Sequence, residues 1–315
     1  MRDFLEEIAT SIRRAVRPWV VGLRGRGIVG MGAAGDVAFE IDRVAENRLE
    51  AALRAFGRPV LYYSEDRGLV SVGSGKPEAA FIVDPIDGTR NARSGFEGCM
   101  VSVAAIAGPL PRAADELTVG DVTHACLAEI VGRRVFYAER GRGSGWREGN
   151  RSFAPRLSGQ TELDQIAWSL VTAGRPLHLL SEVMGELADR TSLTAGFFTS
   201  NSITFSLTRL VTGQLDAALD IANRVCRDRP DTHASFAAAG HGSIIGLCPH
   251  DIAAALLVAR EAGCTVTDAY GKSLDSMPAF DSSAGSLRSC IAAANATLHE
   301  RLLAYVSAGL ARLAG

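Results

Sequence analysis

The feature that most constrains the fold is a short apolar run, AFIVD at residues 80–84, that ends in an acid. A strand without an outward-facing polar position has to be buried on both of its faces. We therefore expect a sheet that other layers cover on both sides. At 315 residues, the chain is long enough for one large domain or for two packed halves.

The pattern of apolar residues predicts an α/β fold. An amphipathic helix is expected over residues 4–19, ending near Pro18, and a second one over 41–56. Short strands are expected at 59–66, 80–84, 98–107, 118–123, 125–131 and 133–138. Residues 139–151 are predicted to form a surface turn that divides the chain into residues 1–150 and 151–315.

The second half alternates strands and helices. Strands are expected at 166–174, 215–222, 264–268 and 289–295. Helices are expected near 177–189, over 202–213, over 250–262, and at the end of the chain to about 313.

Charge and composition exclude several function classes. The net charge of −2 and the pI of about 6.3 give no basis for binding a nucleic acid polymer or an anionic membrane. No apolar run approaches the ~20 residues of a membrane span, and the first residues lack the apolar block of a signal peptide. Six cysteines without metal-ligand spacing predict reduced, mostly buried thiols, so we expect a cytoplasmic protein.

The hexapeptide DPIDGT (84–89) predicts a metal and phosphate site. Asp84 ends the apolar strand, Asp87 follows three residues later, and Gly88-Thr89 opens the next helix. Carboxylates and the Ile86 carbonyl are oxygen ligands for a hard divalent cation, and helix N-terminal amides bind phosphate. In the simplest alternative, the two acids only cap a helix. The DxDxT motif of haloacid-dehalogenase-type phosphatases does not fit, because two residues separate the acids here.

Four segments in order resemble the inositol monophosphatase / fructose-1,6-bisphosphatase superfamily of Mg²⁺-dependent, lithium-sensitive phosphatases, and most closely its archaeal type. They are DPIDGT, the opening GMGAAGDVAFEIDRVAE (30–46), the strand end YYSED (62–66) and the helix HDIAAALLVAREAG (250–263). Residues 203–222 are similar to the family's helix-then-strand segment. The resemblance implies a layered αβαβα sandwich with the site between its halves, and a homodimer.

The resemblance also implies roles for individual residues. Two Mg²⁺ ions are expected, and a third is left open. The residues implied are metal ligands (Glu65, Asp84, the Ile86 carbonyl, Asp87, Asp251), catalytic residues (Asp42, Thr89, Glu65) and substrate-binding residues (Asp87, Gly88, Thr89, Ser202, Asp220).

Two departures from the family pattern concern the expected substrate pocket. His250 replaces the family's tryptophan, and it is expected either in the substrate mouth or as a helix-cap residue. Residues 223–250 form a longer link than usual. Its arginines, Arg224, Arg227 and Arg229, either grip a second anionic group of a substrate or are solvated.

The expected function is hydrolysis of a small phosphate ester by a metal-activated water molecule. Inositol-1-phosphate and fructose-1,6-bisphosphate are the leading substrates. The alternatives are a 3′-phosphoadenosine nucleotide, a biosynthetic sugar phosphate, or a non-catalytic binding role.

Overall fold

The computed structural model describes residues 1–24, 28–31 and 37–314. Residues 32–36 of the opening segment (30–46) lie outside this range. The helices are α1 (Arg2–Val21), α2 (Glu40–Ala55), α3 (Thr89–Ser94), α4 (Leu177–Thr191), α5 (Ile203–Val211), α6 (Ala222–Asp228), α7 (His233–Ala239), α8 (Pro249–Glu261) and α9 (Ala296–Ala314). No helix within the described ranges is both long and apolar enough to cross a membrane.

An eight-stranded sheet occupies the first half of the chain, in the order β10-β9-β8-β7-β6-β5-β3-β4. Its strands are β3 (Val60–Ser64), β4 (Gly68–Val72), β5 (Ala79–Asp87), β6 (Met100–Ala107), β7 (His124–Glu129), β8 (Arg134–Glu139), β9 (Gly143–Glu148) and β10 (Arg151–Phe153). Only β3 and β5 pair in parallel. The strands expected at 98–107, 125–131 and 133–138 therefore form the middle of this sheet, as β6, β7 and β8.

A second sheet of five strands follows, in the order β12-β11-β13-β15-β14. Its strands are β11 (Ala167–Leu170), β12 (Gly196–Phe198), β13 (Ala217–Asp220), β14 (Thr265–Thr267) and β15 (Cys290–Ala293). The pairs β11–β12 and β11–β13 are parallel. A separate antiparallel pair, β1 (Ile28–Met31) and β2 (Val37–Phe39), precedes α2.

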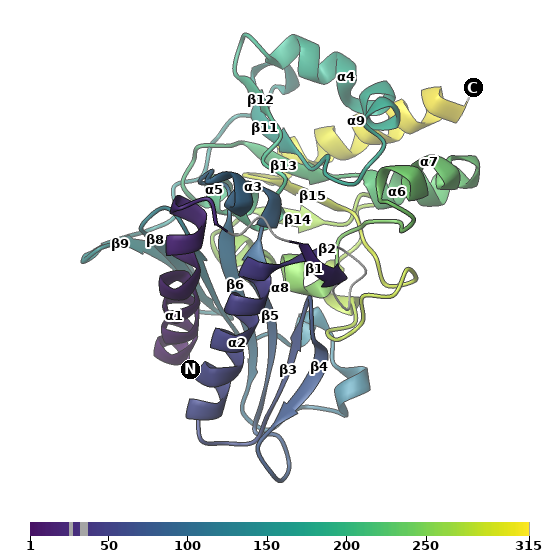
Figure 1. The fold of residues 1–315 in the computed structure, drawn as a ribbon. Coiled ribbons are helices and arrows are strands. Elements are labelled where there is room, and N and C mark those ends of the chain that lie inside the picture. Colours follow the sequence, from purple (N-terminus) through teal and green to yellow (C-terminus); the bar gives the residue numbers. More distant parts are fainter. Residues whose placement is uncertain (25–27, 32–36, 315) are drawn as a thin grey trace.

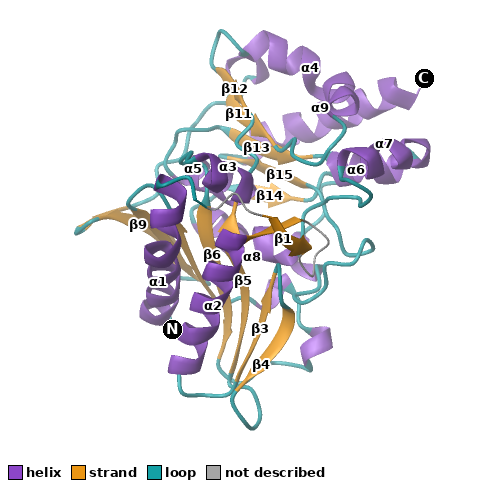
Figure 2. Ribbon diagram, in the orientation of Figure 1, coloured by secondary structure: helices purple, strands orange, loops and turns teal. Residues whose placement is uncertain are grey.

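Three apolar cores arrange these elements into five layers (Figures 1 and 2). Helices α1 and α2 pack on the outer face of the large sheet. Helices α5 and α8 fill the space between the two sheets. Helices α4 and α9 cover the far face of the small sheet. This order confirms the expected αβαβα sandwich.

The apolar strand β5 is buried on both faces, as predicted. Phe81 and Val83 belong to the core under α1 and α2, whereas Ala80 and Ile82 belong to the core that contains α8. Alternate residues of a strand point to opposite faces, so one continuous apolar run contributes to two cores. The end of β5 therefore lies deep between layers.

Three of the predicted elements are wrong. Residues 139–151 are not a surface turn, because they contain the strand β9. Residues 119–121 form a 3₁₀ turn instead of a strand. Helix α1 continues through Pro18 to Val21. The division of the chain near residue 150 stays a prediction.

Candidate active site

A β-bulge at the end of β5 brings Asp84 and Asp87 together. Asp84 pairs with Ser102 of β6 and Asp87 pairs with Met100, so β5 carries one extra residue between the two acids. Residues three apart in a regular strand would point to opposite faces, and the extra residue removes that conflict. Pro85 is tolerated at such a bulge because it needs no ladder hydrogen bond.

Asp251 joins this pair from the first turn of α8. Its Oδ2 accepts a 2.6 Å hydrogen bond from the Cys248 amide, which fixes the carboxylate at the start of the helix. One oxygen from each of Asp84, Asp87 and Asp251 lies within 4.8 Å of the others. Acids 164 residues apart in the chain thus form one cluster.

Burial makes this cluster electrostatically costly in the absence of a cation. Burial and the carboxylates of Glu65, Asp87 and Asp251 raise the pKa of Asp84 well above its ordinary value. Burial and Asp251 raise the pKa of Asp87 to about 7, although hydrogen bonds from Ser202 and Thr204 oppose the shift. A divalent cation would offset the repulsion among these carboxylates.

The donor atoms fit a hard cation such as Mg²⁺. Glu65 follows β3 and lines the same pocket as Asp84 and Ile86. All of these groups offer oxygen, the ligand type that Mg²⁺ prefers. The Ile86 carbonyl already accepts a 2.9 Å hydrogen bond from Thr89 Oγ1, so the second lone pair of this oxygen is the one left for a metal.

The cluster forms one wall of a pocket of about 340 Å³. Gly88 and Thr89 line it beside the acids. Gly88 has a φ of 81°, and a Cβ there would lie 2.6 Å from the Gly98 carbonyl oxygen. Only glycine adopts this conformation without strain, so the tight turn after Asp87 requires it.

Asp220 also lines the pocket, but Arg175 holds its carboxylate. Asp220 Oδ2 accepts a 2.6 Å bond from Arg175, and Oδ1 accepts a bond from the Ala222 amide. Both members of this ion pair are buried. The predicted contact of Asp220 with substrate hydroxyls therefore competes with Arg175, a residue that the sequence analysis did not single out.

Two predicted site residues lie outside the pocket lining that the described residues form. Ser202 is buried, and its hydroxyl donates a 2.6 Å bond to Asp87 while it caps α5. Ser202 therefore holds the Asp87 carboxylate in position without lining the pocket itself. Asp42 lies in the first turn of α2, and its Oδ2 accepts a bond from the Phe39 amide.

The link 223–250 is not a single loop, because it contains α6 and α7. Its three arginines do not line the pocket in the part of the chain that the structure describes. Arg224 bonds the Ala269 carbonyl, Arg227 bonds the Gly285 carbonyl, and Arg229 pairs with Asp231. Their expected grip on a second anion is therefore not supported. The end of the link, Ser243–Cys248, does line the pocket.

The cysteines match the expectation of buried, reduced thiols. All six lie within the described ranges, and each is buried and free. Cys226 and Cys248, which bracket the link, form no disulfide. His250 is buried and lines the pocket, in line with the expected place in the substrate mouth. The alternative of a helix-cap histidine is wrong, because Cys248 is the N-cap residue and His250 lies in the first turn of α8.

Comparison with known proteins assigns the family. The profile of the inositol monophosphatase family matches residues 7–310. The chain belongs to this family. Family membership makes it a phosphatase, in agreement with the reaction class expected from the sequence.

Relatives and solved structures agree with this family assignment. A fructose-1,6-bisphosphatase/inositol-1-monophosphatase of Methanothermobacter thermautotrophicus is 27% identical, over 94% of this chain and 92% of that protein. A bifunctional NADP phosphatase/NAD kinase of Methanococcus maripaludis is 26% identical over 96% of this chain, which spans 49% of that relative. A Thermotoga maritima IMPase structure shares the fold, with a TM-score of 0.69 at 20% identity over 99% of this chain and 98% of that one.

Proposed function

We propose that this phosphatase hydrolyses a small, hydroxylated phosphate monoester with the help of Mg²⁺. The observation that carries the proposal is the convergence of the Asp84, Asp87 and Asp251 carboxylates at the wall of a pocket. Inositol-1-phosphate and fructose-1,6-bisphosphate are the first candidates, because they appear in the names of relatives similar over most of the chain.

Five oxygen donors would hold two Mg²⁺ ions. Glu65, Asp84 and the Ile86 carbonyl are the proposed ligands of one ion, and Asp84, Asp87 and Asp251 those of the other. Asp84 would serve both. When bound, Mg²⁺ acts as a Lewis acid that lowers the pKa of a water molecule and stabilises negative charge on the leaving oxygen.

The chain's own residues would orient the reactants. The Gly88 and Thr89 amides would donate to the phosphate oxygens at the start of α3. Thr89 Oγ1, held by the Ile86 carbonyl, would place a lone pair toward the attacking water. Asp42 lies outside the pocket lining that the described residues form, and its role as acceptor of the water's proton is proposed from the family resemblance alone. Glu65 would assist from the end of β3.

Arg175 is the proposed contact for the part of the substrate beyond the phosphate. Arg175 lines the pocket, and its guanidinium is held by Asp220 and by the Ala173 carbonyl. The buried Nε has no hydrogen-bond partner among the described residues. A substrate hydroxyl or a second phosphate would satisfy this donor. Asp220 would then act by fixing the arginine.

A phosphorylated adenosine nucleotide is the second candidate substrate. Two relatives are named bifunctional NADP phosphatase/NAD kinase, and each matches nearly the whole of this chain. A homodimer, a cytoplasmic location and inhibition by lithium also belong to this proposal, because they are expected from the family resemblance alone.

Phosphate release from a substrate panel tests the proposal. The panel contains inositol-1-phosphate, fructose-1,6-bisphosphate, NADP and 3′-phosphoadenosine 5′-phosphate, each with Mg²⁺ and with excess chelator. We expect Mg²⁺-dependent release that the chelator abolishes, and the order of kcat/KM will identify the substrate class. No release from any of these esters, or release that survives chelation, would contradict the proposal.

A further inference from the structure

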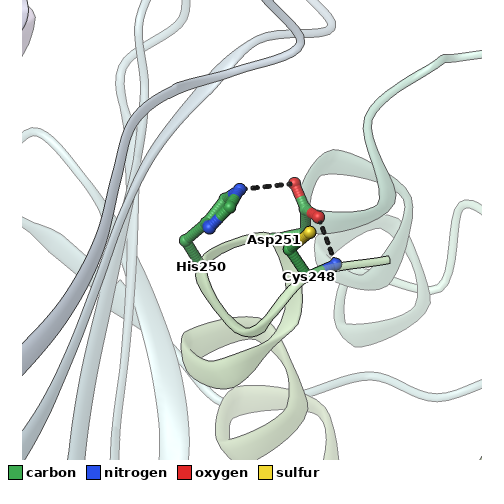
Figure 3. A group of neighbouring side chains, drawn as sticks. All are labelled: Cys248, His250 and Asp251. Carbon is green, nitrogen blue, oxygen red and sulfur yellow. Dashed lines mark hydrogen bonds and ion pairs between the residues drawn. The ribbon is translucent and has the colours of Figure 1, made fainter. Parts of the chain in front are cut away.

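The start of α8 carries a group of three metal-binding side chains of mixed chemistry. Cys248 precedes the helix, Pro249 is its first residue, and His250 and Asp251 follow (Figure 3). One ligand atom from each of Cys248, His250 and Asp251 lies within 4.8 Å of the others. All three residues line the pocket. This group differs from the all-oxygen cluster because a sulfur and a nitrogen replace two of the carboxylates.

His250 has no hydrogen bond that would explain its burial. It is 2% exposed, and its Nδ1 is buried without a hydrogen-bond partner among the described residues. Its Nε2 faces Asp251 Oδ1 at 3.8 Å, too far for a hydrogen bond. The ring instead stacks beside Tyr63, with centroids 6.0 Å apart, which fixes its plane. Nε2, the nitrogen on the Asp251 side, thus makes no hydrogen bond to a described residue, and neither does Nδ1. A buried imidazole without any hydrogen bond points to a missing ligand.

The spacing fits two ligands of one ion. Zn²⁺ binds nitrogen and oxygen at about 2.0–2.2 Å in a tetrahedron, which places the two donor atoms roughly 3.4 Å apart. The observed 3.8 Å between His250 Nε2 and Asp251 Oδ1 is close to this separation.

The donor set selects the kind of metal. Thiolate and imidazole ligands favour Zn²⁺ and similar borderline ions, whereas Mg²⁺ requires oxygen. We propose that Cys248, His250 and Asp251 form a Zn²⁺ site, separate in chemistry from the Asp84–Asp87–Asp251 cluster. Asp251 belongs to both groups. Three protein ligands would leave the fourth position of a tetrahedral ion for water or another small ligand, as in open zinc sites.

The shared aspartate couples the two sites. While the Asp251 carboxylate binds Zn²⁺ beside Cys248, it cannot also bind a Mg²⁺ ion beside Asp84 and Asp87 with the same geometry. Zn²⁺ therefore inhibits Mg²⁺-dependent phosphate release. This consequence, unlike the zinc site itself, rests on the proposed function.

Cobalt binding tests the site without any substrate. Metal-free full-length protein is titrated with Co²⁺, a coloured stand-in for Zn²⁺, and then with Zn²⁺. We expect a near-ultraviolet thiolate-to-cobalt band in the wild-type protein, displaced by Zn²⁺. The band is lost in Cys248→Ser. In His250→Phe, which keeps an aromatic ring beside Tyr63, metal affinity falls by at least about tenfold, the smallest loss seen when an outer-shell partner of a ligand is removed.

Cys264→Ser is the matched control. Cys264 follows the other end of α8 and is as buried as Cys248, at 6% exposed each. This variant keeps the band, and circular dichroism checks that all three variants fold. Absence of the band in the wild-type protein, or its survival in Cys248→Ser, overturns the zinc site whether or not the protein hydrolyses phosphate esters.

Zn²⁺ inhibition of phosphate release tests the coupling. Each protein is compared with its own activity in Mg²⁺ alone. We expect the Zn²⁺ concentration for half inhibition to rise at least tenfold in Cys248→Ser relative to both the wild-type protein and Cys264→Ser. Equal inhibition of all three proteins overturns the coupling through Asp251.

Discussion

Glu46 is a buried acid outside the pocket, and it makes stability depend on pH. Its carboxylate is 3% exposed, neither oxygen has a hydrogen-bond partner among the described residues, and Arg67 lies 3.5 Å away. Burial raises the pKa of Glu46 from 4.5 to about 7. The folded state thus binds this proton more tightly than the unfolded state, so stability is lost as pH rises from about 4.5 through about 7.

Replacement of Glu46 by Gln should remove that dependence. A shift of this size corresponds to about 3 kcal/mol. Between pH 4 and pH 8, we expect the unfolding free energy of Glu46→Gln to rise by about 3 kcal/mol relative to that of the wild-type protein. Urea unfolding at both pH values measures it.

Glu50→Gln provides the control for this effect. Glu50 lies one turn further along α2 and pairs with the same Arg67, but it is more exposed. Its pKa is lowered, first by the hydrogen bond from Arg54, so its replacement should not favour the variant at high pH. If the unfolding free energies of Glu46→Gln and Glu50→Gln changed by the same amount between pH 4 and pH 8, the result would contradict the assignment of the effect to burial of Glu46.

Arg175 should determine how tightly the substrate binds. Arg175→Met removes the proposed donor to the substrate, and we expect KM to rise at least tenfold with a smaller change in kcat. Because the change leaves Asp220 buried without its partner, we also expect a loss of about 3–5 kcal/mol in stability. Steady-state kinetics, at a temperature where the variant is folded, measures the changes in KM and kcat separately. An unchanged KM would contradict a substrate contact.

Residues of the site differed in how well the sequence predicted them. Asp84 and Asp87 were found because a local hexapeptide carries them. Arg175 was missed because its partner, Asp220, lies 45 residues later, and only the pairing of β11 with β13 brings them together. Ser202 was placed near the site, but the hydrogen bond that gives it a positioning role depends on where α5 meets β5.

At the scale of elements, the turn between β5 and α3 should be intolerant of any side chain. Gly88→Ala adds a Cβ that meets the Gly98 carbonyl oxygen at 2.6 Å and forces a positive φ on a non-glycine residue. We expect a loss of about 1–3 kcal/mol in stability, together with loss of activity, because Asp87 and the Thr89 amide shift.

Gly57→Ala separates conformational strain from steric contact. Gly57 also has a positive φ, of 71°, but a Cβ there meets nothing within 4 Å. It should lose stability only modestly and keep its activity. Thermal unfolding and phosphate release measured on both variants make the comparison. Equal effects of the two substitutions would contradict a special role for the β5–α3 turn.

The predictability of each element follows from its pattern. Strand β5 was predicted because its sequence is a run of apolar residues interrupted only by two acids. Strand β9 was missed because it is mostly glycine and charged residues, and its pairing with β8 and β10 is what makes it a strand. Helices α6 and α7 have seven residues each, too few for a clear helical period.

At the scale of the whole molecule, the site joins three of the five layers. Asp84 and Asp87 come from the large sheet, Asp251 from the helical layer between the sheets, and Asp220 from the small sheet. The alternation of strands and helices predicted an α/β fold, and the family resemblance implied its five layers. The sequence did not predict the strand order, which is set by packing between distant segments. A site built across layers depends on the complete fold.

The most direct test of this account is the Mg²⁺ dependence of phosphate release by the wild-type protein and by Asp84→Asn. Asp84 is the acid that both proposed metal positions share. We predict that release rises to saturation with Mg²⁺ in the wild-type protein, and that Asp84→Asn, folded by circular dichroism, loses at least about a thousandfold in kcat/KM, roughly 4 kcal/mol of transition-state stabilisation. A folded Asp84→Asn that keeps near-wild-type release at the same Mg²⁺ concentrations would contradict it.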